Sequence, residues 1–292
     1  MFGILNVNKP TGWTSRDVVN RVQRLGRPAK AGHAGTLDPL ATGVLVVCVG
    51  PATRLISYVQ QMPKTYEATF LLGRTSPSED TETEVTELTN APEPSLAEIE
   101  AHLPQFQGTI DQRPPAYSAL KVKGQRAYKL AREGQAVELK SRPVEIYELA
   151  LEEYLYPELR LTIHCGSGTY VRSLGRDLAE SLDTGAVMSA LVRTAIGDFC
   201  VDDALDIEQL NGELIEKSLI APLAAVAHMP RLLLSDSQQI EIRHGRRIPT
   251  HELAVTPSSP TETFVAVDSQ GQLLALLQER RPGQLGAVCN FC

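Results

Sequence analysis

An uncharged apolar run, GVLVVCVG at residues 43–50, places the strongest constraint on how this chain folds. A second run, APLAAVA at 221–227, is shorter still, and both fall well below the roughly 20 apolar residues that span a bilayer. The first run has the length and β-branched content of a buried strand. The start of the chain, MFGILNVNKP, lacks the basic residues and apolar core of a signal peptide. We therefore expect a cytoplasmic protein with this strand inside its core.

The segments around this run alternate between helical and strand periodicity. Residues 14–26 predict a helix whose N-cap is Thr14 or Ser15, and residues 64–73, KTYEATFLLG, alternate as a half-buried strand. Residues 159–185 predict a strand, a Gly-Ser-Gly turn and a helix. The acidic segment TSPSEDTETEVTELTNAPEP, which begins at residue 75, predicts a solvated, mobile connector. From about residue 230, short strands and turns predict a small β-rich C-terminal domain.

The charges of the chain are unevenly distributed. The net charge is −7, yet residues 1–74 carry nine Lys and Arg against three acids, and residues 112–142 carry eight against two. Residues 75–111 between them carry nine acids and no base. Two basic segments that flank an acidic one fit a protein with a basic face that attracts a polyanion. By charge alone, ordinary solvated surface residues explain the pattern equally well.

The five cysteines do not form a recognisable metal or disulfide framework. The C-terminal CNFC is a C-x-x-C, but structural zinc needs a second pair of ligands that the sequence does not offer. Neither a Walker A loop nor a G-x-G-x-x-G turn is present. We therefore expect no metal and no cofactor.

A loop rich in Gly and Thr, AGHAGTLDPLATG at residues 31–43, brings a lone acid, Asp38, close to His33. Taken one at a time, the candidate side chains of this chain have structural explanations. An Asp before Pro is commonly a turn former, and His33 is equally a satisfied core or surface histidine. Tyr66 on a patterned strand reads as a core aromatic, and Arg172 on a helix reads as a solvated charge.

The combination of motifs points further than any one of them. The blocks GILNVNKPTGWTSRDVV, GHAGTLDPLATGVLVVCVGPATR, KTYEATFLLG, RPPAYSALKVKGQRAYKLAREG, CGSGTYVRSLGRDL and LVRTAIGDF run in order from residue 3 to about 200. In this order the chain resembles the tRNA pseudouridine synthases of the TruB family, and the block from Arg113 resembles its stand-alone bacterial type. Two positions depart from the family pattern: Asn8 stands where Asp is usual, and the segment after Thr75 lacks the Gly of a Thr/Asp/Gly pattern.

The resemblance implies an α+β fold. A central mixed, largely antiparallel sheet would be flanked by helices in a catalytic domain over residues 1–229. An RNA-gripping arm would span about 112–142. A small PUA-like RNA-binding domain, rich in strands, would follow over residues 230–292.

The reaction that the resemblance implies converts uridine to its C-glycoside isomer in the T loop of tRNA, at position 55. Asp38 would be the catalytic carboxylate, acting by attack at C1′, attack at C6 or removal of the 2′ proton, and the sequence leaves these paths open. Arg172 would pair with Asp38 and lower its pKa. No second acid is evident beside Asp38, because Glu67 alternates onto the strand face opposite Tyr66.

The same resemblance assigns the substrate contacts. Tyr66 would stack on the target base, Tyr170 and Leu191 would line its pocket, and His33 would insert into the T loop to hold the base out. The residues expected to contact RNA are basic and come from both basic segments: Lys9, Lys64, Lys121, Lys123 and Arg126. The partner would be the tRNA T stem-loop, met by a monomer without guide RNA or membrane.

Two other classes of function remain open from the sequence. One is a non-catalytic tRNA-binding or tRNA-folding chaperone on the same scaffold. The other is a carboxylate hydrolase that acts on small glycosides, which requires a second acid near Asp38.

Overall fold

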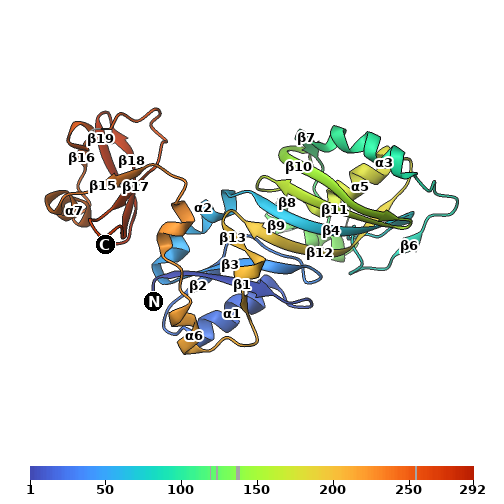
Figure 1. The fold of residues 1–292 in the computed structure, drawn as a ribbon, viewed down its shortest axis with the longest axis horizontal. Coiled ribbons are helices and arrows are strands. Elements are labelled where there is room, and N and C mark those ends of the chain that lie inside the picture. The colour runs from blue at the N-terminus through green and yellow to red at the C-terminus, as the bar shows by residue number, and fades with distance from the viewer. Residues whose placement is uncertain (119, 123, 136–138, 254) are drawn as a thin grey trace.

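A large mixed sheet forms the centre of the molecule (Figure 1). The computed structural model describes residues 1–118, 120–122, 124–135, 139–253 and 255–292. Within these residues the sheet has ten strands, and two pairs, β1 with β14 and β3 with β12, are parallel while the others are antiparallel. The main path runs β14 (Leu205–Asp206), β1 (Gly3–Lys9), β3 (Thr42–Val49), β12 (Ala186–Ile196), β4 (Lys64–Leu72), β11 (Glu158–Cys165), β10 (Arg142–Leu155), β7 (Gly108–Gln112), with β13 (Phe199–Cys200) beside β12 and β2 (Ala31–His33) beside β3. The expected mixed, largely antiparallel sheet is confirmed.

The apolar run at residues 43–50 forms most of β3, as the sequence predicts. Every residue of β3 after Thr42 is buried. Strand β1 pairs with β3 along its whole length, from Gly3 to Lys9. On the other side, β12 pairs with the start of β3, where Val192 is opposite Thr42. An uncharged run suits this place because both faces of the sheet are covered here.

Helices cover the two faces of this part of the sheet. Helix α1 (Ser15–Leu25) begins with a capping box between Thr14 and Asp17 and packs on the face that includes Leu45. Helix α2 (Ile56–Gln61) packs on the opposite face, which includes Val44.

Helix α5 (Val171–Ser181) covers the other half of the sheet, beside α3 (Leu96–His102). It lies so close to β4 that a Cβ on Gly175 would stand 2.1 Å from Cε1 of Phe70. The strand and helix expected over residues 159–185 are therefore confirmed, and glycine at 175 sets the distance between α5 and β4.

The acidic segment after β4 departs from the sequence-based expectation. It pairs briefly as β5 (Arg74–Thr75) with β6 (Thr86–Glu87). Between these strands, Ser78 is 2% exposed and Asp80 is 1% exposed. The prediction of a solvated connector is therefore wrong for this part of the segment.

The basic arm contains a short hairpin and a helix: β8 (Lys121–Val122), β9 (Gln125–Arg126) and α4 (Ala127–Arg132). After α6 (Gly212–Lys217), the chain enters a second sheet, with α7 (Asp236–Arg243) against it. This sheet has the order β15 (Arg231–Leu233), β17 (Phe264–Val267), β18 (Leu273–Arg281), β19 (Gln284–Asn290), β16 (Ile248–Pro249). The expected strand-rich C-terminal region is thus present.

The second sheet lies beside α2, close to the N-terminus (Figure 1). Val265 and Leu276 share an apolar cluster with Val59 of α2. The ring of Phe291 stacks on Phe2, with centroids 5.4 Å apart. In the described part of the chain, no helix is both long and apolar enough to cross a membrane.

Candidate active site

The loop that follows β2 carries Asp38 and is anchored by two earlier segments of the chain. The Ser15 hydroxyl, at the start of α1, accepts a hydrogen bond from Leu37 N at 2.8 Å and donates to Leu37 O at 3.1 Å. Lys9 Nζ, at the end of β1, donates to Pro39 O at 3.3 Å. The residues on both sides of Asp38 are therefore fixed to the core, which limits how far the carboxylate moves.

Asp38 forms an ion pair with Arg172, as the resemblance implies. Oδ2 of Asp38 lies 3.1 Å from Nε of Arg172, and the two side chains are 34% and 7% exposed. The guanidinium also donates to Ser78 O at 2.6 Å and to Tyr117 O at 3.0 Å. Arg172 is thus a buried, fully engaged cation and not the solvated charge that its helix position suggests. It holds Asp38 in one pose at the edge of open space.

A second carboxylate, Asp80, shares the same arginine. Its Oδ2 lies 3.3 Å from Nη1 of Arg172, and its Oδ1 accepts hydrogen bonds from Ser78 Oγ at 2.5 Å and from Glu82 N at 3.0 Å. The sequence interpretation placed this residue in a mobile connector and found no second acid. The structure instead gives a triad in which one cation lies between two acids.

The second acid bears directly on the glycoside-hydrolase hypothesis. A hydrolase of that class needs two carboxyl groups that both reach the substrate. Asp80 is 1% exposed, and it is not among the residues that line the cleft around Asp38. Its oxygens are engaged by Arg172, Ser78 and Glu82. Asp80 is therefore placed to hold Arg172 and does not face the cleft.

The pKa of Asp38 lies above its ordinary value. Loss of hydration by burial raises the pKa, and this effect outweighs Arg172, which lowers it. Asp80 raises it further, whereas Lys9 lowers it. The expectation that the arginine would leave Asp38 with a lowered pKa is wrong because desolvation is the larger cause. A higher pKa makes the carboxylate a stronger base and nucleophile.

A cleft of about 510 Å³ opens beside Asp38 and includes Arg172 in its lining. Tyr66 and Leu191 form part of its wall and are 8% and 7% exposed. They come from neighbouring strands, where Leu191 of β12 pairs with Ala68 of β4. Tyr170, at the N-cap of α5, also lines the cleft. The structure therefore brings the predicted pocket residues together.

Tyr66 lies beside an arginine that the sequence interpretation did not assign. Arg193 of β12 is the register partner of Tyr66 and is 1% exposed, and its guanidinium donates to Val44 O at 2.7 Å and Gly35 O at 3.1 Å. Burial raises the pKa of Tyr66. The phenol is therefore neutral at neutral pH, which suits a wall against which a base stacks.

His33 lies at the end of β2 and outside the lining of the cleft. Burial lowers its pKa, and the positive charge of Arg16 lowers it further. The imidazole is therefore neutral at neutral pH. A neutral ring is compatible with the expected insertion between nucleotides, whose stacked bases are uncharged.

Two lysines expected on the RNA surface are buried instead. Lys9 is 0% exposed, and its ammonium also donates to Trp13 O at 2.7 Å. Lys64 is 6% exposed and donates to Gln60 O at 2.5 Å and Met62 O at 2.6 Å. Burial lowers the pKa of each lysine to about 8. Both ammonium groups bind backbone carbonyls, and Lys64 also lines the cleft, so their expected contacts with RNA stay a prediction.

The other expected RNA contacts lie on the arm. Arg126 is exposed at the end of β9. Lys121 pairs with it across the hairpin, although its side chain lies outside what the structure describes. Lys123 is outside the described residues. The arm also reaches the cleft, because Tyr117 and Ser118 line it.

The sequence interpretation gave no role to Asp80 or Arg193, although both lie in segments that it used. Asp80 lies in the segment compared with the Thr/Asp/Gly pattern, and that pattern contains an acid. Arg193 lies in LVRTAIGDF, where only Leu191 was assigned. For Arg193, the available signal was its place inside a strand-like apolar block, since a charged residue is rarely buried unless it is paired.

Comparison with known proteins gives a consistent result. Residues 23–171 match the family described as TruB family pseudouridylate synthase (N terminal domain). A protein of Arthrobacter sp. (strain FB24) named tRNA pseudouridine synthase B is 42% identical over 288 residues, covering 96% of this chain and 93% of that protein. A protein of the same name in Microcystis aeruginosa (strain NIES-843 / IAM M-2473) is 38% identical over 280 residues, covering 94% and 93%.

Solved structures agree on the fold. The crystal structure of a Cbf5-Nop10-Gar1 complex matches with a TM-score of 0.77 at 24% identity, covering 99% of this chain and 84% of that chain. An H/ACA RNP bound to a substrate RNA containing 2′-deoxyuridine matches with a TM-score of 0.73 at 24% identity, covering 95% and 78%. At this identity the likeness shows the fold alone.

Proposed function

This chain belongs to the TruB family of pseudouridylate synthases, and from that membership we propose that it isomerises a uridine of tRNA to pseudouridine. The proposed target is position 55 in the T loop. The observation that carries the proposal is the pose of Asp38, which is 3.1 Å from Arg172 at the edge of a cleft walled by Tyr66 and Leu191. We further propose that the chain acts as a cytoplasmic monomer without a guide RNA.

The chemistry requires one carboxylate and an extruded nucleotide. The N1–C1′ bond breaks, the base rotates, and C5 bonds to C1′ as its proton leaves. Asp38 either attacks C1′ or C6, or removes the 2′ proton. The raised pKa of Asp38 supports all three roles, because each needs an oxygen that binds a proton or carbon strongly. Arg172 keeps that oxygen in place throughout.

The proposed recognition of RNA uses three parts of the chain. His33 fills the space that the extruded base leaves, since flipping costs a few kcal/mol and the duplex or loop would otherwise close. The basic arm, residues 112–142, contacts phosphates of the T stem-loop. The C-terminal sheet over residues 230–292 serves as a PUA-like RNA-binding domain after a catalytic domain over 1–229.

No observation favours a non-catalytic tRNA-folding chaperone over the isomerase. Such a protein needs RNA-binding surfaces but has no use for a buried Arg172 shared between Asp38 and Asp80.

The direct test is to incubate the protein with unmodified tRNA and map pseudouridine by position. We expect a single new pseudouridine at position 55. Modification only at other positions would refute the proposed target, and the absence of pseudouridine would refute the proposed activity.

A further inference from the structure

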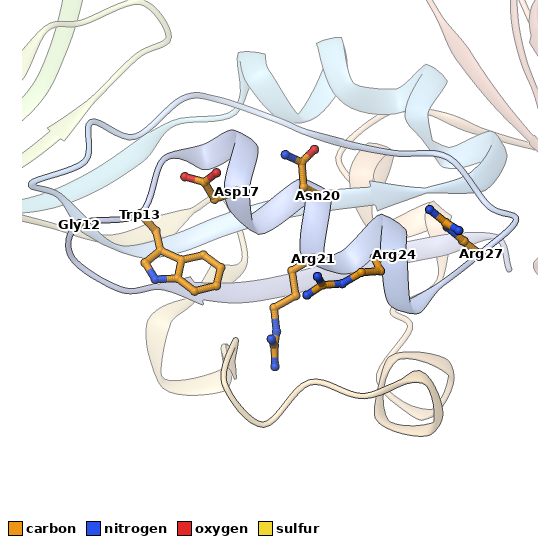
Figure 2. Close-up of a pocket in the computed structure, with 7 residues that line it drawn as sticks. All are labelled: Gly12, Trp13, Asp17, Asn20, Arg21, Arg24 and Arg27. Carbon is orange, nitrogen blue, oxygen red and sulfur yellow. The ribbon is translucent and has the colours of Figure 1, made fainter.

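A groove of about 620 Å³ runs along α1, outside the cleft that contains Asp38 (Figure 2). Trp13 lies at one end of it and Arg27 at the other, with Arg21 and Arg24 between them. Gly12, Asp17 and Asn20 complete the lining. None of these residues has a part in the proposed chemistry, so the groove needs an explanation of its own.

The groove is strongly basic in a chain whose net charge is −7. Residues 13–30 contain five Lys and Arg and one acid, Asp17. The carboxylate of Asp17 is occupied by the helix cap, where it accepts hydrogen bonds from N and Oγ1 of Thr14. In the described part of the chain, neither Arg24 nor Arg27 forms an ion pair with an acid. The glutamates of the neighbouring helix α6 are among the acids that are described. The arginines are therefore available to an external anion.

The floor of the groove is fixed before any ligand arrives. Arg21 donates from Nε to Ile207 O at 2.8 Å and from Nη2 to Glu208 O at 3.0 Å. The carbonyl of Trp13 is held by the ammonium of Lys9 at 2.7 Å. The held guanidinium of Arg21 and the fixed backbone at Trp13 reduce the entropy cost of ordering this surface, which favours binding.

The groove begins where the active-site loop ends. Gly12 N donates to Pro39 O at 2.8 Å, one residue after Asp38. Arg16, in the first turn of α1, is close enough to His33 to lower its pKa. From Ser15, helix α1 extends for 11 residues, which is about 16 Å. A polyanion that passes His33 and follows α1 therefore meets Arg24 and Arg27 beyond the nucleotides next to the reacting base.

We propose that this groove binds the sugar–phosphate backbone of the RNA substrate, on the strand that leads away from the target nucleotide. Arg24 and Arg27 contact phosphates, and Trp13 offers a face for a base or ribose. This inference rests on the proposed function and extends it by adding a second RNA-binding surface to the arm. RNA fits better than an isolated anion because the basic side chains are spread along a helix and one end is aromatic.

The chain contains one tryptophan, so its intrinsic fluorescence reports on the end of the groove at Trp13 and on the active-site loop beside it. We expect unmodified tRNA to change the intrinsic Trp fluorescence in a saturable way. We also expect the variant Arg24→Gln/Arg27→Gln to bind tRNA more weakly, with a log Kd against log salt slope reduced by about 1.4 to 1.8 for two lost phosphate contacts. Its KM should rise while kcat stays unchanged. Arg160→Gln, an exposed arginine on β11 paired with Glu153, is the matched control.

Three outcomes would overturn the inference: no fluorescence change at saturating tRNA, an unchanged salt slope in the double variant, or an equal loss in the control. A fluorescence change that persists in the double variant with an unchanged slope would assign the signal to the active-site loop and would also overturn it. If the wild type binds tRNA with these signatures but forms no pseudouridine, the proposed function fails and the groove assignment stands. If pseudouridine forms normally while both signatures are absent, only the groove assignment fails.

Discussion

Asp80→Asn removes one of the two negative charges that share Arg172 while keeping the size of the side chain. In the protein, the Asp80 carboxylate accepts from three donors: Arg172 Nη1, Ser78 Oγ and the backbone N–H of Glu82. An asparagine has one acceptor oxygen and one NH₂ group, so an N–H donor must face either Arg172 or Glu82 N. At least one bond of the charged group is lost in either orientation.

The size of the effect follows from these contacts. A hydrogen bond to a charged group contributes about 1.5–3 kcal/mol. If the loss lets Arg172 shift from Asp38, the rate falls by roughly 10- to 100-fold, at 1.36 kcal/mol per factor of ten. The charge itself also matters, because Asp80 raises the pKa of Asp38. Since Asp38 acts as an anion, activity is lost as pH falls through its pKa, and the variant should keep activity to lower pH than the wild type.

The assay is single-turnover pseudouridine formation in tRNA from about pH 5 to pH 8, with urea unfolding of both proteins alongside. Asp111→Asn, an exposed acid on β7, is the control and should leave rate and pH profile unchanged. A folded Asp80→Asn protein with the wild-type rate and an unshifted acidic limb would refute the positioning role.

Three further predictions follow from other parts of the structure. Burial lowers the pKa of Lys9 from 10.5 to about 8, so between these pH values the folded protein binds fewer protons than the unfolded chain. The unfolding free energy of the wild type minus that of Lys9→Met should therefore rise by roughly 2–3 kcal/mol from pH 7 to pH 10. A difference in urea unfolding that does not change with pH would contradict this. Gly175→Ala should lower the unfolding free energy by about 1–3 kcal/mol, because the new Cβ meets Phe70 at 2.1 Å, although Ala favours helices; an equal or higher melting temperature would show that α5 moves freely. Lys121→Ala with Lys123→Ala should weaken tRNA binding and flatten its salt dependence, and an unchanged slope would remove the arm from the interface.

The elements that the sequence predicted well are those with strong local signals. The run in β3, the alternation of β4 and the N-cap of α1 at Thr14 each depend on a few neighbouring residues, and all three form as expected. The strand and helix that carry Arg172 follow the same rule. Hydrophobic periodicity suffices for such elements because burial decides them.

The parts that the sequence did not predict depend on contacts between distant segments. Asp80 lies in a stretch whose acidic composition indicates solvent exposure, and it is buried only because Arg172 lies 92 positions later in the sequence and faces it. The pKa of Asp38 is a second example. Its pairing with Arg172 was foreseeable, but the extent of its desolvation depends on the whole wall of the cleft.

The burial of two lysines also depends on contacts that the sequence pattern does not show. Lys9 and Lys64 lie in basic segments, and composition favours a solvated, RNA-facing position for both. The backbone carbonyls that surround each ammonium come from local turns, and for Lys9 also from the active-site loop at Pro39. No pattern in the sequence predicts that several backbone carbonyl groups will surround one ammonium group.

The central claim is that the Asp38 carboxylate performs the isomerisation, and Asp38→Asn tests it most directly. The amide keeps the shape of the side chain but cannot act as a nucleophile or base. We predict that the variant binds unmodified tRNA within a few-fold of the wild type and forms no pseudouridine at position 55. Pseudouridine formation by Asp38→Asn at the wild-type rate would contradict the account.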